Sequence, residues 1–125
     1  MEQYLIDTNA VSHYMSAMLT QPGIDFMDDV IDATPNLSVI SQIELLSWKT
    51  PKSSQISDFI HDSLIYNITP DVVAICINIR KNRKIKTPDA IIAATAIANN
   101  FTLVTDNEKD FENIPKLKVV NPKKL

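Results

Sequence analysis

The stretch from Lys86 to Asn107, KTPDAIIAATAIANNFTLVTDN, predicts a helix, a tight turn and a strand, with acidic residues near both ends. Its first residues predict a helix that Thr87 caps, because Thr is a favoured N-cap and proline suits the first helical position. The segment Ala90–Ala98 is apolar on nearly every side, which indicates a buried or sandwiched helix. A short β-type run, residues 101–105, follows at once. The pattern therefore predicts an internal helix that leads directly into an internal strand.

The remaining chain repeats the same alternation of strands and helices. The connections between the predicted strands are long enough to hold helices, which favours parallel pairing with helices on both faces. We predict a single domain, residues 1–125, with a three-layer α/β/α architecture and a mainly parallel central sheet of four to five strands. The predicted strands are 3–6, 37–40, 65–68, 101–105 and 118–120.

Acidic residues recur where these strands end or their helices begin. Ligands of open parallel sheets bind outside the carboxyl ends of the strands, so acids placed there are candidate site residues. Clustered carboxylates repel one another unless a hard divalent cation neutralises them, and oxygen ligands suit Mg²⁺ or Mn²⁺. The four candidates are Asp7, Glu44, Asp89 and Asp106.

Three of these acids also have a specific structural explanation. Asp7 precedes a helical pattern and would serve as its N-cap. Ser41 and Glu44 match the S-x-x-E capping box, in which the Glu reaches back to the Ser amide. Asp89 would favour the dipole in the first turn of its helix. The residues alone leave structure and function open.

Composition excludes several other chemistries. A single glycine, Gly23, rules out glycine-rich phosphate loops, and the two histidines, His13 and His61, do not form a zinc motif. The single Cys76 allows no intramolecular disulfide, which favours a reducing compartment. The sequence has no signal-peptide pattern and no apolar run of about 18 residues, so we expect a cytoplasmic protein without a membrane span.

Basic residues gather just before Asp89, although the formal net charge is −3. One interpretation is that they complement the dipole at a helix C-terminus. The other is that they contact the phosphates of a nucleic acid. The members of this basic run are Arg80, Lys81, Arg83, Lys84 and Lys86.

Three segments, YLIDTNAVSHY, ISQIELLSW and TPDAIIAATAIANNFTLVTDNEKDF, resemble PIN-domain endoribonucleases. Within that family the chain is similar, over essentially its whole length, to the VapC toxins of bacterial type II toxin–antitoxin systems. The resemblance implies that Asp7, Glu44 and Asp89 are the first three invariant acids. It further implies supporting roles for Thr8, Asn9 and Thr105.

The fourth acid of the family pattern is missing here. Many relatives have an acid two places after the position of Thr105, where this chain has Asn107. By alignment, Asn107 and Asp110 are the expected pocket members, and Asp106 is the nearest alternative carboxylate. Which of the three completes the cluster is left open.

The resemblance implies a metal-dependent endoribonuclease that hydrolyses RNA, with tRNA among the candidate substrates. Asp7, Glu44 and Asp89 would hold Mg²⁺ or Mn²⁺, and the basic run would hold RNA phosphates. It also implies a VapB-type antitoxin as partner and a homodimer. Two faces, Ile24/Met27/Ile31 and Leu45/Leu46/Trp48, would serve either as such contacts or as ordinary core.

Two other functions compete with this one. A non-catalytic PIN-like binding or scaffold domain would use the acids only as helix caps, and Asn107 is its best support. A metal-dependent phosphatase or deoxyribonuclease on another doubly wound fold is the third possibility. The aspartyl-phosphate type of phosphatase is disfavoured, because it requires an Asp two residues after Asp7 and the chain has Asn9 there.

Overall fold

The structure is a computed structural model that describes residues 2–125. In this part of the chain the strands form one five-stranded sheet with the order β3-β2-β1-β4-β5, and every neighbouring pair is parallel. The predicted parallel sheet is thus confirmed, and each predicted strand is found to within two residues at either end. The strands are β1 Tyr4–Ile6, β2 Asn36–Ser38, β3 Leu64–Tyr66, β4 Thr102–Val104 and β5 Lys118–Val120.

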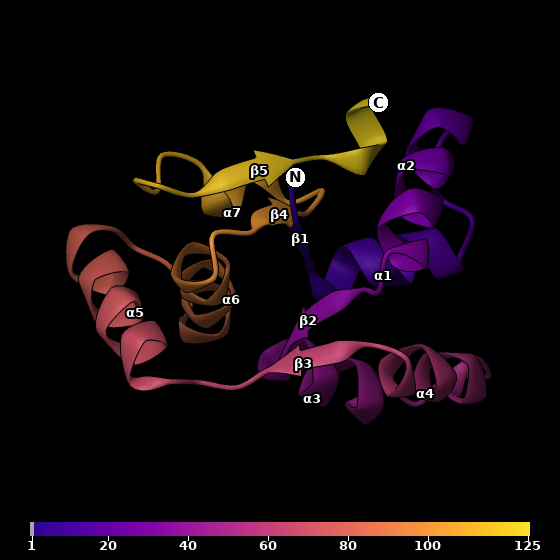
Figure 1. Cartoon of the computed structure of the whole chain (residues 1–125), viewed down its shortest axis with the longest axis horizontal. Coiled ribbons are helices and arrows are strands. Elements are labelled where there is room, and N and C mark those ends of the chain that lie inside the picture. Colours follow the sequence, from indigo (N-terminus) through magenta and orange to yellow (C-terminus); the bar gives the residue numbers. More distant parts are fainter. Residues whose placement is uncertain (1) are drawn as a thin grey trace.

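Helices cover both faces of the sheet (Figure 1). The helices α5 and α6 lie together on one side, and α1, α2 and α4 lie on the other, so the three-layer α/β/α prediction is confirmed. The helices are α1 Thr8–Met15, α2 Gln21–Asp32, α3 Val39–Ser47, α4 Ser53–His61, α5 Pro70–Asn82, α6 Thr87–Ala98, α7 Glu108–Phe111 and the 3₁₀ turn η1 Pro122–Lys124.

Strand alternation divides the hydrophobic core into two layers. Leu5 and Leu103 face a cluster with α5 and α6, whereas their neighbours Ile6 and Val104 face a cluster with α1, α2 and α4. Side chains of successive strand residues point to opposite faces, so the central strands β1 and β4 carry apolar residues on both. Helix α6 is buried along most of its length, as its composition predicted.

Two helix starts differ from the sequence prediction. Helix α3 begins at Val39 with Ser38 as its N-cap, so the capping box predicted at Ser41 and Glu44 is wrong. Ser41 and Glu44 lie inside the helix instead. Helix α6 begins at Thr87 with Lys86 at the N-cap position and no side-chain cap, one residue earlier than predicted.

The Ile24/Met27/Ile31 face of α2 is core, with Met27 fully buried. The second face is divided, because Leu45 is buried while Leu46 and Trp48 are exposed. Among the described residues no helix has the length and apolar character that a membrane crossing requires.

The sheet topology brings distant acids to one edge. β1 and β4 are neighbours, and both end at the same edge, where α1 and the segment leading to α7 begin. β2 runs parallel to β1 and leads into α3 from that edge. The N-terminal turns of α1 and α3 therefore start side by side, which positions the site described next.

Candidate active site

Asp7 lies at the carboxyl end of β1 and is buried, with 5% of its surface exposed. It caps α1: its Oδ1 accepts a hydrogen bond from the Thr8 amide at 2.9 Å, and its Oδ2 accepts one from the Thr105 hydroxyl at 2.7 Å. Burial, together with the charges of Asp89 and Glu44, raises the pKa of Asp7 to about 6, although these two hydrogen bonds lower it. The carboxylate is therefore held in place but poorly neutralised.

Glu44 reaches the same region from just past the middle of α3. Its Oε1 accepts a hydrogen bond from the Thr8 hydroxyl at 2.6 Å, and that hydroxyl is also hydrogen-bonded to Ser41 at 2.9 Å. Ser41 is fully buried one helical turn before Glu44. Thr8 and Ser41 thus fix the direction of Glu44, which does not cap its helix.

Asp89 contributes a third carboxylate from the first turn of α6. Burial raises the pKa of Asp89, and the charges of Asp110 and Glu44 raise it further, while Lys86 opposes them. Asp7, Glu44 and Asp89 line one cavity of about 360 Å³. The other lining residues are Thr8, Asn9, Ile43, Ser47, Trp48 and Asn107.

Asn107 enters this cavity from the loop after β4. The backbone N–H of Asn107 donates to the Thr105 hydroxyl oxygen at 3.0 Å, and the side-chain Nδ2 of Asn107 donates to Asp110 Oδ2 at 2.6 Å. Because Thr105 in turn donates to Asp7, a chain of hydrogen bonds joins the loop to the first carboxylate. Thr105, Asn107 and Asp110 form one connected group.

Asp106 lies elsewhere. Its carboxylate Oδ2 is 2.9 Å from the Lys123 Nζ and 2.5 Å from the His13 Nδ1, although the His13 approach lacks the alignment of a hydrogen bond. Only 8% of the Asp106 side chain is exposed. Asp106 does not line the cavity of the other acids, and its charge is paired with a cation instead.

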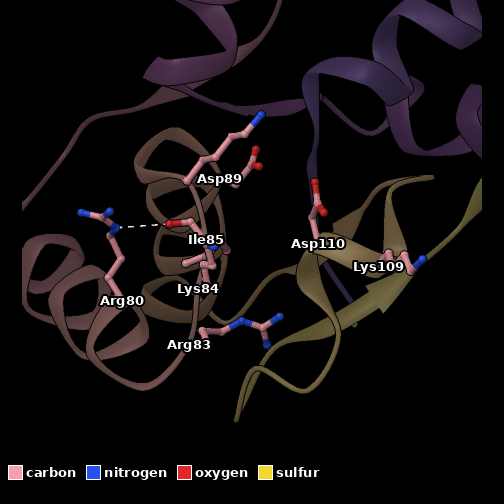
Figure 2. A pocket seen from close by; sticks show the side chains of 8 residues that line it. Arg80, Arg83, Lys84, Ile85, Asp89, Lys109 and Asp110 are labelled. Carbon is pink, nitrogen blue, oxygen red and sulfur yellow. Dashed lines mark hydrogen bonds between the residues drawn. The ribbon is translucent and has the colours of Figure 1, made fainter.

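A second pocket, of about 460 Å³, adjoins the first and shares Asp89 with it. Figure 2 shows Arg80 and Arg83 on one side of this pocket and Asp110 and Lys109 on the other, with Asp89 above them in the first turn of α6. Arg80 Nε donates to the Ile85 carbonyl at 3.3 Å, which orders the segment between α5 and α6. The basic wall, comprising Arg80, Arg83, Lys84, Lys86 and Lys109, thus borders the carboxylates.

Residues 4–117 match the family model described as "PIN domain". The chain belongs to the PIN domain family. Ribonuclease VapC of Rickettsia bellii (strain RML369-C) is 29% identical over 127 residues, which cover 96% of this chain and 87% of that protein.

Solved structures share the PIN fold of this chain. A toxin–antitoxin complex from Klebsiella pneumoniae contains a chain with 30% identity and a TM-score of 0.73, covering 96% of this chain and 98% of that one. VapBC2 from Rickettsia felis, bound to a DNA fragment from its promoter, contains a chain with 26% identity and a TM-score of 0.75, covering 94% and 97%. FitAcB from Neisseria gonorrhoeae, at 23% identity and a TM-score of 0.76, shares the fold.

This PIN domain brings most of the predicted site residues together. Asp7, Thr8, Asn9, Glu44, Asp89 and Asn107 line the carboxylate cavity, with Thr105 directly behind Asp7. Asp110 lies in the adjoining pocket. Asp106 is outside both, and Lys81 is exposed on α5 but is not part of the basic wall.

Sequence reasoning missed several residues of the site. Ser41 appeared only as a cap, and Lys109, Ile43 and Trp48 were not associated with the pockets. Ile43 and Trp48 are 56% and 37% exposed at the rim of the carboxylate cavity, a position that helical spacing does not reveal. Lys109 lies in a segment of mixed charge, so no sequence signal set it apart.

Proposed function

We propose that this PIN domain is a metal-dependent endoribonuclease of the VapC type, the toxin of a toxin–antitoxin pair. The observation that carries the proposal is the convergence of Asp7, Glu44 and Asp89 on one cavity beside a basic wall. Asp7 and Glu44 belong to segments 37 residues apart, and Asp89 to a third, so local helix capping does not account for their meeting. The similarity to Ribonuclease VapC supports RNA as the substrate.

The donor set fits a hard divalent cation such as Mg²⁺ or Mn²⁺. All the groups are oxygen ligands. Burial, and to a smaller extent the charges of neighbouring carboxylates, raises the pKa values of Asp7 and Asp89, and a bound cation would stabilise their charged forms. Among residues 2–125, no three acid, imidazole or thiol groups already enclose an ion, because Glu44 is turned toward Thr8. Asp7, Glu44 and Asp89 would hold the ion, with Asn107 as a neutral neighbour.

When bound, such an ion lowers the pKa of water and stabilises negative charge that builds on a phosphate. The protein supplies the positioning. Thr105 and the Thr8 amide hold Asp7 in one orientation, and the Thr8 hydroxyl holds Glu44. The basic wall binds the RNA backbone next to the acids, so that a phosphodiester is presented to them.

The partner proposed for this toxin is a VapB-type antitoxin, as in the Rickettsia felis complex. Its place would be over the carboxylate cavity, where the exposed Ile43 and Trp48 form an apolar rim and Leu46 is exposed on the same helix. A homodimer and tRNA as the substrate are further predictions from the family resemblance.

The decisive experiment measures RNA cleavage and thermal unfolding of antitoxin-free protein in Mn²⁺, Mg²⁺ or EDTA. The wild type should cleave RNA only with metal, and Mn²⁺ should raise its melting temperature. Asp7→Asn should lose both responses while its circular dichroism spectrum is unchanged. Retained cleavage in Asp7→Asn would contradict the proposal, and single-stranded DNA and phosphate esters serve as control substrates.

The second candidate is a non-catalytic PIN-like binding domain, favoured by the Asn at position 107. Its premise that the acids are caps holds for Asp7 alone, since Ser38 caps α3 and Asp89 lies within the first turn of α6. This candidate predicts neither metal stabilisation nor cleavage of any substrate. The same experiment therefore separates the two.

A further inference from the structure

Two lysines of the turn η1, Pro122–Lys124, form ion pairs with the loop that carries Asn107. Lys123 Nζ lies 2.9 Å from Asp106 Oδ2, and Lys124 Nζ donates to Glu108 Oε2 at 2.5 Å. The two acids flank Asn107 on either side in the sequence. Two adjacent lysines thus hold both neighbours of the one residue of this loop that lines the carboxylate cavity.

The two ion pairs differ in burial, so they differ in importance. Lys124 and Glu108 are 68% and 39% exposed, and such exposed pairs contribute little to stability. Asp106 is only 8% exposed, and its other charged neighbour is His13. Removing the partner of a buried charge leaves that charge uncompensated, which is strongly unfavourable. Of the two lysines, Lys123 is therefore the one whose ion pair matters for the position of the loop.

The turn that presents Lys123 is itself firmly held. The side chain of Asn121 accepts a hydrogen bond from the Lys123 amide at 2.9 Å, and Pro122 is buried. Helix α2 approaches so closely that a Cβ on Gly23 would lie 2.3 Å from the Pro122 carbonyl oxygen. Lys123 thus extends from a support fixed by packing against α2.

Asp106 transmits this restraint to the cavity. It lies between Thr105, which donates to Asp7, and Asn107, whose amide donates back to Thr105 at 3.0 Å. A rotation of Asp106 away from Lys123 would turn the following peptide and move Asn107 out of the cavity. We propose that Lys123 is a positioning residue that, through Asp106, keeps Asn107 directed into the carboxylate cavity. This inference rests on the proposed nuclease function.

The test compares Lys123→Met, Lys123→Arg and the matched control Lys124→Met, which removes the same charge from the same turn. Lys123→Met should lower kcat for RNA cleavage roughly 10- to 100-fold, the effect expected when a catalytic constellation is displaced by about an ångström, with KM little changed. Lys123→Arg should restore kcat, and Lys124→Met should match the wild type. In metal-free protein, amide exchange of segment 105–110 should accelerate in Lys123→Met alone.

Asp106→Asn and the double variant Asp106→Asn/Lys123→Met complete the design. If the two residues act as a pair, the double variant should be no worse than either single variant. If Asp106 is instead a metal ligand, Asp106→Asn alone would weaken Mn²⁺ binding in a calorimetric titration, and the inference would be wrong.

Two further outcomes overturn the inference without touching the proposed function. A rise in KM with unchanged kcat would make Lys123 an RNA contact, and wild-type kinetics in Lys123→Met would make it dispensable. Failure of the wild type to cleave RNA would overturn the proposed function, and the exchange measurement would still decide whether Lys123 restrains the loop. Unchanged exchange in Lys123→Met would contradict that restraint.

Discussion

Asp7 has a carboxylate in a place where the groups that contact it are neutral donors. The Thr8 amide and the Thr105 hydroxyl stabilise its charged form, but burial and the charges of Asp89 and Glu44 outweigh them. Its pKa is therefore raised to about 6 from an ordinary value of 3.8. Keeping this carboxylate charged therefore lowers the stability of the metal-free protein.

This raised pKa predicts an unusual dependence of stability on pH. The folded chain binds a proton at Asp7 more tightly than the unfolded chain, so folding takes up a proton between pH values of about 4 and 6. The metal-free protein should gain stability as the pH falls from 7 toward 4, and a shift of about two pKa units corresponds to roughly 3 kcal/mol at most. Urea unfolding at pH 7.5 and at pH 5 measures this change in the free energy of unfolding. A wild type that loses stability over this interval would contradict the prediction.

Asp7→Asn should remove much of this dependence. The Asn side chain can still accept from the Thr8 amide, and no buried charge remains, so metal-free Asp7→Asn should be more stable than the wild type by roughly 1–3 kcal/mol at pH 7.5. Urea unfolding with EDTA tests this, and adding Mn²⁺ should reverse the order of the two proteins. A destabilised Asp7→Asn would show that Asp7 acts mainly as the cap of α1.

In helix α3 a capping motif occurs in the sequence at a place where the helix does not begin. The pattern S-x-x-E occurs at Ser41 and Glu44, but the chain turns into a helix three residues earlier, at Ser38. Ser38 accepts a hydrogen bond from the Ile40 amide at 3.1 Å, whereas Ser41 and Glu44 contact Thr8 from the neighbouring helix. The apparent cap thus belongs to the site.

Substitutions in α3 separate these two roles. Ser38→Ala should lower the free energy of unfolding by about 1 kcal/mol, the usual effect of losing an N-cap. Glu44→Gln should cause no such loss and should slightly stabilise the metal-free protein, because one of three repelling carboxylates is gone. Urea unfolding in EDTA compares the two. A loss of about 1 kcal/mol in Glu44→Gln would restore the capping explanation.

Sequence patterns located the elements of this fold but not all of their contacts. Hydrophobic periodicity placed the five strands because each buried strand is a short apolar run between turn residues. The family resemblance placed Asn107 and Asp110 ahead of Asp106, but local sequence patterns could not decide among the three, because their surroundings come from distant parts of the chain. His13 and Lys123 draw Asp106 away from the cavity, and no local pattern encodes that pairing.

Across the whole molecule, charge is distributed more unevenly than the net value of −3 indicates. The basic wall of Arg80, Arg83, Lys84, Lys86 and Lys109 adjoins the acids, and its members come from α5, α7 and the segment before α6. The negative net charge therefore does not argue against the proposed RNA binding, because this wall is a local region of positive charge.

Binding of single-stranded RNA should accordingly depend on salt. Arg83→Gln or Lys86→Gln should weaken binding and reduce the slope of log K against log salt by about 0.7 for each phosphate that the variant no longer neutralises. Lys81→Gln is the matched control, since Lys81 is exposed on α5 but is not part of the wall. Fluorescence anisotropy over a range of salt, with a catalytically inactive variant, measures the slope. An equal effect of Lys81→Gln would mean that binding follows net charge alone.

Gly23 lies where helix α2 packs against the turn η1, close to Pro122. Gly→Ala in a helix ordinarily stabilises by up to about 1 kcal/mol, but here the new Cβ would lie 2.3 Å from a backbone oxygen. Gly23→Ala should therefore destabilise the protein, by roughly 1–3 kcal/mol as overpacking does. Ala substitution of the exposed Ser57 on α4 is the control in urea unfolding. Stabilisation by Gly23→Ala would show that η1 shifts freely.

The position of β4 in the sheet has a consequence for the timing of folding. β4 lies between β1 and β5, so the edge that carries Asp7 is not closed until residues 102–104 insert beside residues 4–6. Pairing across nearly a hundred residues is slow to nucleate, and a chain emerging from the ribosome cannot form it until that segment is free. During synthesis, therefore, the nascent chain carries its acids but no assembled site, and any activity that depends on the site begins only after the last strands have left the ribosome.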